Sequence, residues 1–220
     1  FGMYKQDVIT AKVIRNIQEK FNYPKTVIVA TGKNMPQRII DVANIIKGWQ
    51  LGASIQTTDS DVLKASNRQN ITSSAYKKLI DFGNKSNATK TYTDLMVALP
   101  GDTKEKHFES LRHALENDVN SMQIHQAILL TGSSLVSQET RSKFQLSGKF
   151  RIMPGGVAQY QFGEQKVSVA EIEEIIVASK DMTFKDYVSC RIMDLFIEAF
   201  VTTGLWDEFF AALRKMNVSV

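Results

Sequence analysis

Residues 92–115 read YTDLMVALPGDTKEKHFESLRHAL, and this stretch decides the fold class. Its first part is predicted to be a β-strand that ends at Pro100-Gly101. Thr103 then begins a helix with apolar side chains at helical spacing on one face, namely Phe108, Leu111 and Leu115. A strand followed at once by a helix is the repeating unit of a parallel α/β sheet.

The same alternation extends to both sides of this stretch. Predicted strands cover residues 26–30, 53–56, 92–99 and 121–130. Predicted helices cover residues 7–21, 38–49, 59–67 and 73–82, together with the helix that follows residue 103. Short loops between them indicate βαβ units, and the polar and glycine residues after the strands gather where α/β proteins bind ligands.

After residue 137 the pattern changes. Residues 137–166, which contain Pro154-Gly155-Gly156, are expected to be a loop-rich connector. Amphipathic helices are expected over residues 169–178, 184–200 and 206–216. The predicted fold is therefore α/β: a partial open (β/α) barrel with parallel strands over residues 1–150, and a connector with a helical C-terminal extension over 151–220.

Composition narrows the function classes. Of the 220 residues, 43% are hydrophobic and 23% charged, which is typical of a globular protein. The net charge of +4 suits phosphate- or carboxylate-bearing ligands and gives no reason to expect nucleic acid.

No apolar run is long enough to span a membrane and no signal peptide is visible, so a cytoplasmic location is expected. Because a helix is predicted after only one short loop, the chain is expected to start in the middle of a fold.

Several isolated residues favour structural interpretations. Gly32-Lys33 lacks the rest of a phosphate-binding loop, which favours a turn with a solvated lysine; the alternative is a lysine directed into a pocket at the strand end. His107 and His113 are six residues apart, a spacing unsuited to zinc, so no metal site is expected. Cys190, the single cysteine, lies in an amphipathic stretch and is expected to be a packed thiol.

Polar residues in and near two predicted strands are more informative. Ser54 and Gln56 share one face of their strand, and Asp94 interrupts an apolar strand. Arg68 follows the next short helix, where a guanidinium could hold a carboxylate. From spacing alone, a ligand site and a polar core cluster in which Arg68 pairs with Asp94 or Asp59 are about equally supported.

At these residues the sequence resembles the radical S-adenosylmethionine (SAM) enzymes, in the branch that carries a cobalamin-binding domain. The segments that carry the resemblance are residues 54–71, 94–111 and 129–135, with the opening FGMYKQD. Residues 54–71 are similar to the fourth strand of that family and the helix after it, and residues 94–111 to its fifth strand and loop. Residues 129–135 are similar to the end of its sixth strand, and the opening residues to the loop after its second strand. The similarity runs over nearly the whole chain.

The resemblance implies roles for individual residues. The family positions that match Gln56 and Asp94 contact the SAM ribose, and the one that matches Arg68 binds the methionyl carboxylate. An amide and a carboxylate suit a diol, and a guanidinium suits a carboxylate, so the chemistry agrees. Ser54 is grouped with them as a cofactor-binding residue. Ala98 stands where relatives often have glycine.

The defining CxxxCxxC motif of the family is absent from this chain. The [4Fe–4S] cluster ligands, and any cobalamin domain, are therefore expected upstream, and this chain alone is predicted to lack catalytic residues and to be inactive. The intact enzyme would cleave SAM to a 5′-deoxyadenosyl radical or support cobalamin-dependent methyl transfer, with an electron donor and a small-molecule substrate as partners. Candidate substrate contacts on the last strand are Gln123, His125 and Gln126.

Two rival interpretations remain open. One is a non-redox α/β binding domain or degenerate barrel, whose interior would close on its own side chains. The other is a phosphate-binding (β/α)₈ enzyme, which would need further βα units.

Overall fold

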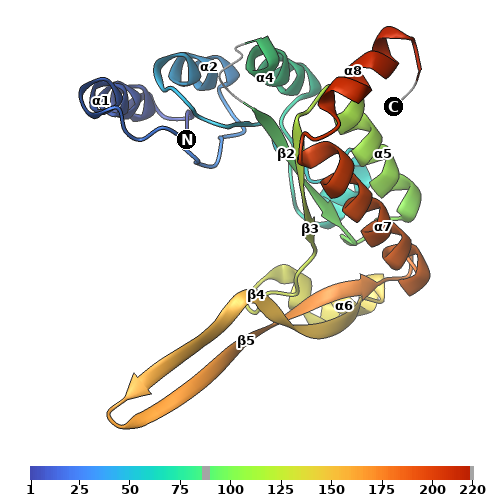
Figure 1. Cartoon of the computed structure of the whole chain (residues 1–220). Coiled ribbons are helices and arrows are strands. Elements are labelled where there is room, and N and C mark those ends of the chain that lie inside the picture. Colours follow the sequence, from blue (N-terminus) through green and yellow to red (C-terminus); the bar gives the residue numbers. More distant parts are fainter. Residues whose placement is uncertain (86–89, 219–220) are drawn as a thin grey trace.

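The structure is a computed structural model that describes residues 1–85 and 90–218. A parallel sheet with the strand order β1-β2-β3 forms the body, and an antiparallel hairpin, β4–β5, extends away from it (Figure 1). The strands are β1 (Leu51–Gly52), β2 (Thr91–Val97), β3 (Ser121–Gln126), β4 (Ser147–Phe162) and β5 (Gln165–Ala178). The α/β class and the parallel sheet predicted from sequence are confirmed.

Helices alternate with the strands along the body and then form the C-terminal region. They are α1 (Lys5–Phe21), α2 (Pro36–Ile45), α3 (Ser60–Ala65), α4 (Ser73–Lys85), α5 (Lys104–Glu116), α6 (Gln138–Phe144), α7 (Phe184–Ile197) and α8 (Asp207–Lys215). All five helices expected in the body are present. The two expected over 184–200 and 206–216 are also present and confirm the helical C-terminal extension. Among the described residues, no helix has the length and apolar content needed to cross a lipid bilayer.

The side chains of β2 alternate between two faces of the sheet. Thr93, Leu95 and Val97 are fully buried on the face that α4 and α5 cover. Tyr92, Asp94 and Met96 are half-buried on the other face. Burying an aliphatic side chain such as Leu95 is worth about 1.5–3 kcal/mol, so the helix-covered face anchors the sheet. The other face is left for polar chemistry.

The predicted first and second strands are shorter than expected. Residues 26–30 contribute a single parallel bridge, between Val27 and Trp49. The strand expected over 53–56 is assigned two residues earlier, as β1, although its continuation still pairs with β2: Ala53 N donates to Tyr92 O at 2.9 Å, and Met96 N donates to Gln56 O at 2.8 Å. The chain therefore passes along the sheet edge as far as Gln56.

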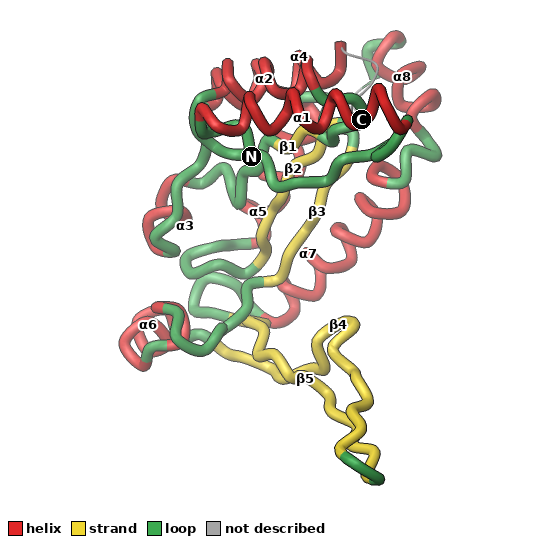
Figure 2. The backbone as a smooth tube through the Cα atoms, turned by 90° about the vertical axis from the view of Figure 1, so that its left-hand side faces the viewer, coloured by secondary structure: helices red, strands yellow, loops and turns green. Residues whose placement is uncertain are grey.

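The hairpin corrects two predictions, the helix over residues 169–178 and the loop-rich connector over residues 137–166. Residues 169–178 are not a helix but most of β5, and much of the expected connector is β4. The Pro154-Gly155-Gly156 segment lies within β4, at a register shift where the pairing passes from Ile152 with Ile172 to Val157 with Ala170. Proline and glycine are tolerated there because a bulge needs neither regular pairing nor a ladder N–H. Figure 2 shows the hairpin leaving the body beside α6 and the lower end of α7.

Candidate functional site

A polar cluster joins two neighbouring strands on the face without helices. The Ser54 hydroxyl donates a hydrogen bond to Oδ2 of Asp94. The other carboxylate oxygen, Oδ1, lies 3.3 Å from Nε2 of His125 on β3. The parallel register sets this geometry, because Asp94 pairs with Gln123 and Met96 pairs with His125. Ser54, Asp94 and His125 therefore form one connected group near the carboxyl ends of the strands.

The ionisation of this group follows from its surroundings. Burial by itself would raise the pKa of Asp94, but hydrogen bonds from His125 and Ser54 outweigh burial and hold the pKa below its ordinary value of 3.8. The hydrogen bond to Asp94 raises the pKa of His125 above 6.5, against the opposing effect of burial. Asp94 is thus an ionised acceptor at neutral pH.

Gln56 is held by its backbone and by a lysine. Its N–H donates to Oδ1 of Asn70 at 3.3 Å, and its side-chain Oε1 accepts a hydrogen bond from Nζ of Lys33 at 3.1 Å. Nζ of Lys33 also donates to the carbonyl oxygen of Gln69 at 3.1 Å. Within the described residues, the amide nitrogen Nε2 of Gln56 has no partner, so it is free to donate to a ligand.

Arg68 follows α3, whose start is capped by Asp59 through hydrogen bonds from Asp61 N and Val62 N, both at 2.9 Å. Its side chain is exposed and makes no ion pair with any described residue. Asp59 instead pairs with Lys106 at 3.3 Å, and Asp94 pairs with His125. The interpretation in which Arg68 pairs with Asp94 or Asp59 is therefore wrong.

The three candidate substrate residues on β3 do not share one face. Gln123 and His125 are exposed on the face that carries Asp94. Gln126 lies on the opposite face, where its amide donates to the Tyr187 hydroxyl of α7 and accepts from Arg151 of β4. The structure therefore brings Gln123 and His125 to the cluster and uses Gln126 to link β3 to the C-terminal elements.

Sequence reasoning missed Tyr92 and gave Lys33 only as an alternative. The Tyr92 ring lies against Gly52 of β1, where an added Cβ would be 2.4 Å from Cζ of the ring. Burial, together with Asp94, raises the pKa of Tyr92. Gly52, a glycine inside a strand, was the feature of the sequence that indicated a close contact at this place. Ala98 has φ +64°, a left-handed conformation that favours glycine, the residue that the family resemblance suggests at this position.

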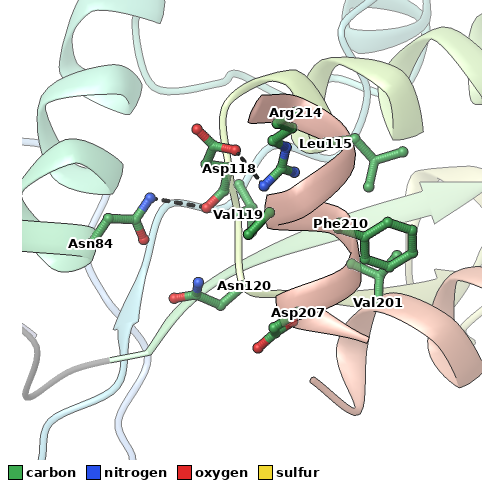
Figure 3. A pocket seen from close by; sticks show the side chains of 10 residues that line it. Asn84, Leu115, Asp118, Val119, Asn120, Val201, Asp207, Phe210 and Arg214 are labelled. Carbon is green, nitrogen blue, oxygen red and sulfur yellow. Dashed lines mark hydrogen bonds and ion pairs between the residues drawn. The ribbon is translucent and has the colours of Figure 1, made fainter. Parts of the chain in front are cut away.

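Cavities lie at both ends of the sheet. One of about 380 Å³ lies at the amino ends of the strands, between α4, α5 and α8 (Figure 3). Asp118 there pairs with Arg214 at 2.9 Å and accepts from Asn84 through its carbonyl oxygen. The other, of about 360 Å³, lies at the carboxyl ends, and Lys33 and Asn70 line it. Lys33 therefore connects this second cavity to Gln56.

The part of the chain that the structure describes shows no group of side chains suited to an iron–sulfur cluster. Cys190 is fully buried in α7, and burial raises the pKa of its thiol to about 12. Across residues 1–85 and 90–218, no three His, Cys, Asp or Glu side chains are grouped so that they could hold a metal ion. Ser54, Gln56 and Asp94, in contrast, fit a hydroxyl-bearing organic ligand, because they combine an ionised acceptor with a free amide donor.

Comparisons with known proteins agree with the sequence motifs. The chain is 28% identical over 153 residues to the cobalamin-dependent radical SAM methyltransferase TokK of Streptomyces tokunonensis, covering 66% of this chain and 22% of that protein. It is 24% identical over 197 residues to a 2-(S-pantetheinyl)-carbapenam-3-carboxylate methyltransferase of Streptantibioticus cattleyicolor, covering 86% and 28%. No family profile matches.

Among solved structures, the radical SAM coproporphyrinogen III oxidase of Escherichia coli aligns with a TM-score of 0.46 and 15% identity, over 54% of this chain and 28% of that chain. The assignment rests on the two sequence matches. The chain spans about a quarter of the length of those relatives, with 22% and 28% of each covered. These two matches show that the chain is similar to cobalamin-dependent radical SAM methyltransferases, and they support a relationship to the cobalamin branch of the radical SAM superfamily.

Proposed function

We propose that this chain supplies part of the SAM-binding site of a larger radical SAM enzyme. The observation that carries the proposal is the Ser54–Asp94–His125 group, which joins residues far apart in sequence on the open face of a parallel sheet. Gln56 lies at the same sheet end, because its carbonyl oxygen accepts from Met96 N of β2.

Each residue has a role that its chemistry supports. The Asp94 carboxylate accepts hydrogen bonds from ribose hydroxyls, and Nε2 of Gln56 donates to them. Ser54 holds the carboxylate in place. Arg68, with a free and exposed guanidinium, binds the methionyl carboxylate by paired N–H donors.

The remaining chemistry belongs to groups that this chain does not hold. A [4Fe–4S] cluster held elsewhere in the enzyme would supply the electron for the reductive cleavage of bound SAM to methionine and a 5′-deoxyadenosyl radical, and a cobalamin would supply methyl-transfer chemistry. We place the ligands of the cluster and any cobalamin domain elsewhere in the enzyme, and propose an electron donor and a small-molecule substrate as its partners. Gln123 and His125, exposed beside Asp94, are the proposed substrate contacts. Residues 1–150 are the proposed barrel part, and 151–220 the extension.

Equilibrium binding of SAM to the chain tests the proposal. We expect saturable binding that Asp94→Asn weakens at least about tenfold, because a hydrogen bond to a charged acceptor is worth about 1.5–3 kcal/mol. Asp81→Asn, at an exposed carboxylate on α4, is the matched control and should bind like the unsubstituted chain. Absence of saturable binding, or equal binding by Asp94→Asn, would contradict the proposal.

The rival interpretation is a polar cluster that closes on itself. It predicts that Asp94→Asn changes stability and leaves ligand binding absent in every variant. The open face argues against it, since the His125 side chain is 55% exposed although it contacts Asp94.

A further inference from the structure

Lys33 is a cation in an unusual position at the carboxyl end of the sheet. Its ammonium group donates to two neutral acceptors, Oε1 of Gln56 and the carbonyl oxygen of Gln69, both at 3.1 Å. No carboxylate among the described residues pairs with it. The third N–H of the ammonium group therefore remains for another acceptor.

The surroundings of Lys33 are electrostatically unbalanced. The side chain is partly buried, and burial lowers its pKa below 10.5; the neighbouring charge of Arg68 lowers it further. The charge of Asp94 raises the pKa, but this is the smallest of the three effects, and Asp94 makes no ion pair with Lys33. Partly buried charges in proteins are normally paired, so an ammonium group that has no paired carboxylate and lies near a second cation indicates a place for an anion.

The cavity beside Lys33 has the character that an anion requires. It is about 360 Å³, and its lining includes Lys33, Asn70 and Lys78 but no acidic residue. Lys78, which also lines the cavity, is already bonded to Oε1 of Gln37 at 2.7 Å. Lys33 both lines the cavity and contacts Gln56, so the cavity adjoins the residue assigned to the ribose.

We propose that Lys33 and Arg68 together bind one carboxylate, that of the amino-acid end of SAM. This inference rests on the proposed function and adds a second cation to its site. Lys33 touches Gln56, assigned to the ribose, and its other acceptor, Gln69, directly follows Arg68. The lysine thus spans the distance between the ribose end and the carboxylate end of the ligand.

The test compares SAM with 5′-methylthioadenosine, which has the same nucleoside and a thioether but no carboxylate. Binding of both ligands is measured for the unsubstituted chain, Lys33→Gln, Lys33→Arg and the control Lys64→Gln. Lys64 is an exposed lysine on α3 that lies 3.5 Å from Asp61. Lys33→Gln keeps a hydrogen-bond donor and removes the charge.

We expect Lys33→Gln to weaken SAM at least about tenfold and methylthioadenosine less than about twofold, with Lys33→Arg retaining most of the SAM affinity. Equal losses for both ligands would overturn the inference and make Lys33 a support for Gln56. Unchanged SAM binding in Lys33→Gln would overturn it as well. Each of these results leaves the proposed function intact, whereas an unsubstituted chain that binds neither ligand would contradict the proposed function itself.

Discussion

Asp94 of β2 and His125 of β3 are joined by a contact of 3.3 Å between Oδ1 and Nε2, across a parallel strand pair in which neither residue faces the other directly. Asp94 is half-buried and His125 is largely exposed. The carboxylate is therefore fixed by the sheet while the imidazole remains open to solvent. This arrangement couples the ionisation of one residue to the other, and a ligand that binds Asp94 would change the charge on His125.

Asp94→Asn should lower the pKa of His125. The hydrogen bond to the Asp94 carboxylate is what raises that pKa above 6.5, and burial acts in the opposite direction. Without the carboxylate, burial remains, so the pKa should fall to 6.5 or below. Titration of the imidazole C–H resonances by NMR measures the change. A His125 pKa that stays the same in Asp94→Asn would mean that the two residues do not interact in solution.

Local signals in the sequence predicted the body of the fold well. The alternation of β2 and the apolar face of α5 are periodic patterns whose partners lie nearby in the chain. The helix caps were also readable, since Asp59 and Thr103 accept from the first turns of α3 and α5. The sequence marked Ser54 and Asp94 as site residues because both are polar on strands that should be apolar, but the partner that it suggested for Asp94 was Arg68 and not Ser54.

The hairpin and the lysine contact could not be predicted in this way. In β5 the apolar residues Val169, Ile172 and Ile176 fall at helical spacing, and the strand is revealed only by its pairing with β4. The glycines of β4 suggested a loop because a bulge and a loop have the same composition. Lys33 reaches Gln56 across 23 residues, and such a contact depends on tertiary structure that no local pattern encodes.

The contact between His107 and Asp194 should be a major link between the body and the C-terminal extension. Nε2 of His107 on α5 lies 2.7 Å from Oδ1 of Asp194 on α7, and both side chains are buried. His107→Ala would leave that carboxylate, among the residues that the structure describes, with Arg191 alone, at 2.8 Å, so we expect a loss of about 3 kcal/mol in the free energy of unfolding. Urea denaturation measures it. His125→Gln is the control, at an exposed histidine, and an equal loss there would refute the assignment.

Asp102 should make stability depend on pH. It is buried in the loop after β2, where its Oδ2 accepts from Ala98 N at 3.1 Å, and burial raises its pKa from 3.8 to about 6. Between pH 4 and 6 the folded state then holds a proton that the unfolded state releases, so stability falls as pH rises across that window. A shift of about two units corresponds to about 2–3 kcal/mol.

Asp102→Asn keeps an oxygen acceptor and removes the titration. The difference in unfolding free energy between the variant and the unsubstituted chain should therefore grow from pH 4 to pH 7 in favour of the variant. Asp81→Asn should show no such trend, because that carboxylate is exposed on α4. If the two stability curves ran parallel across this pH range, the pKa of Asp102 would not be raised by burial in the folded chain.

Cys190 should be unreactive in the folded chain. The thiolate is the reactive form, and burial raises the pKa of this thiol to about 12, so almost none is ionised at pH 8. The side chain is also fully inaccessible in α7, which packs against α5 and β5. Reaction with an aromatic disulfide reagent should therefore proceed only as fast as the chain opens, and should become immediate in denaturant. Destabilising the contact between α5 and α7 by His107→Ala should increase the native rate in proportion to the population of the opened state. Rapid labelling of the unsubstituted chain would instead mean that α7 does not pack stably against α5 and β5, and that the C-terminal extension moves independently of the body.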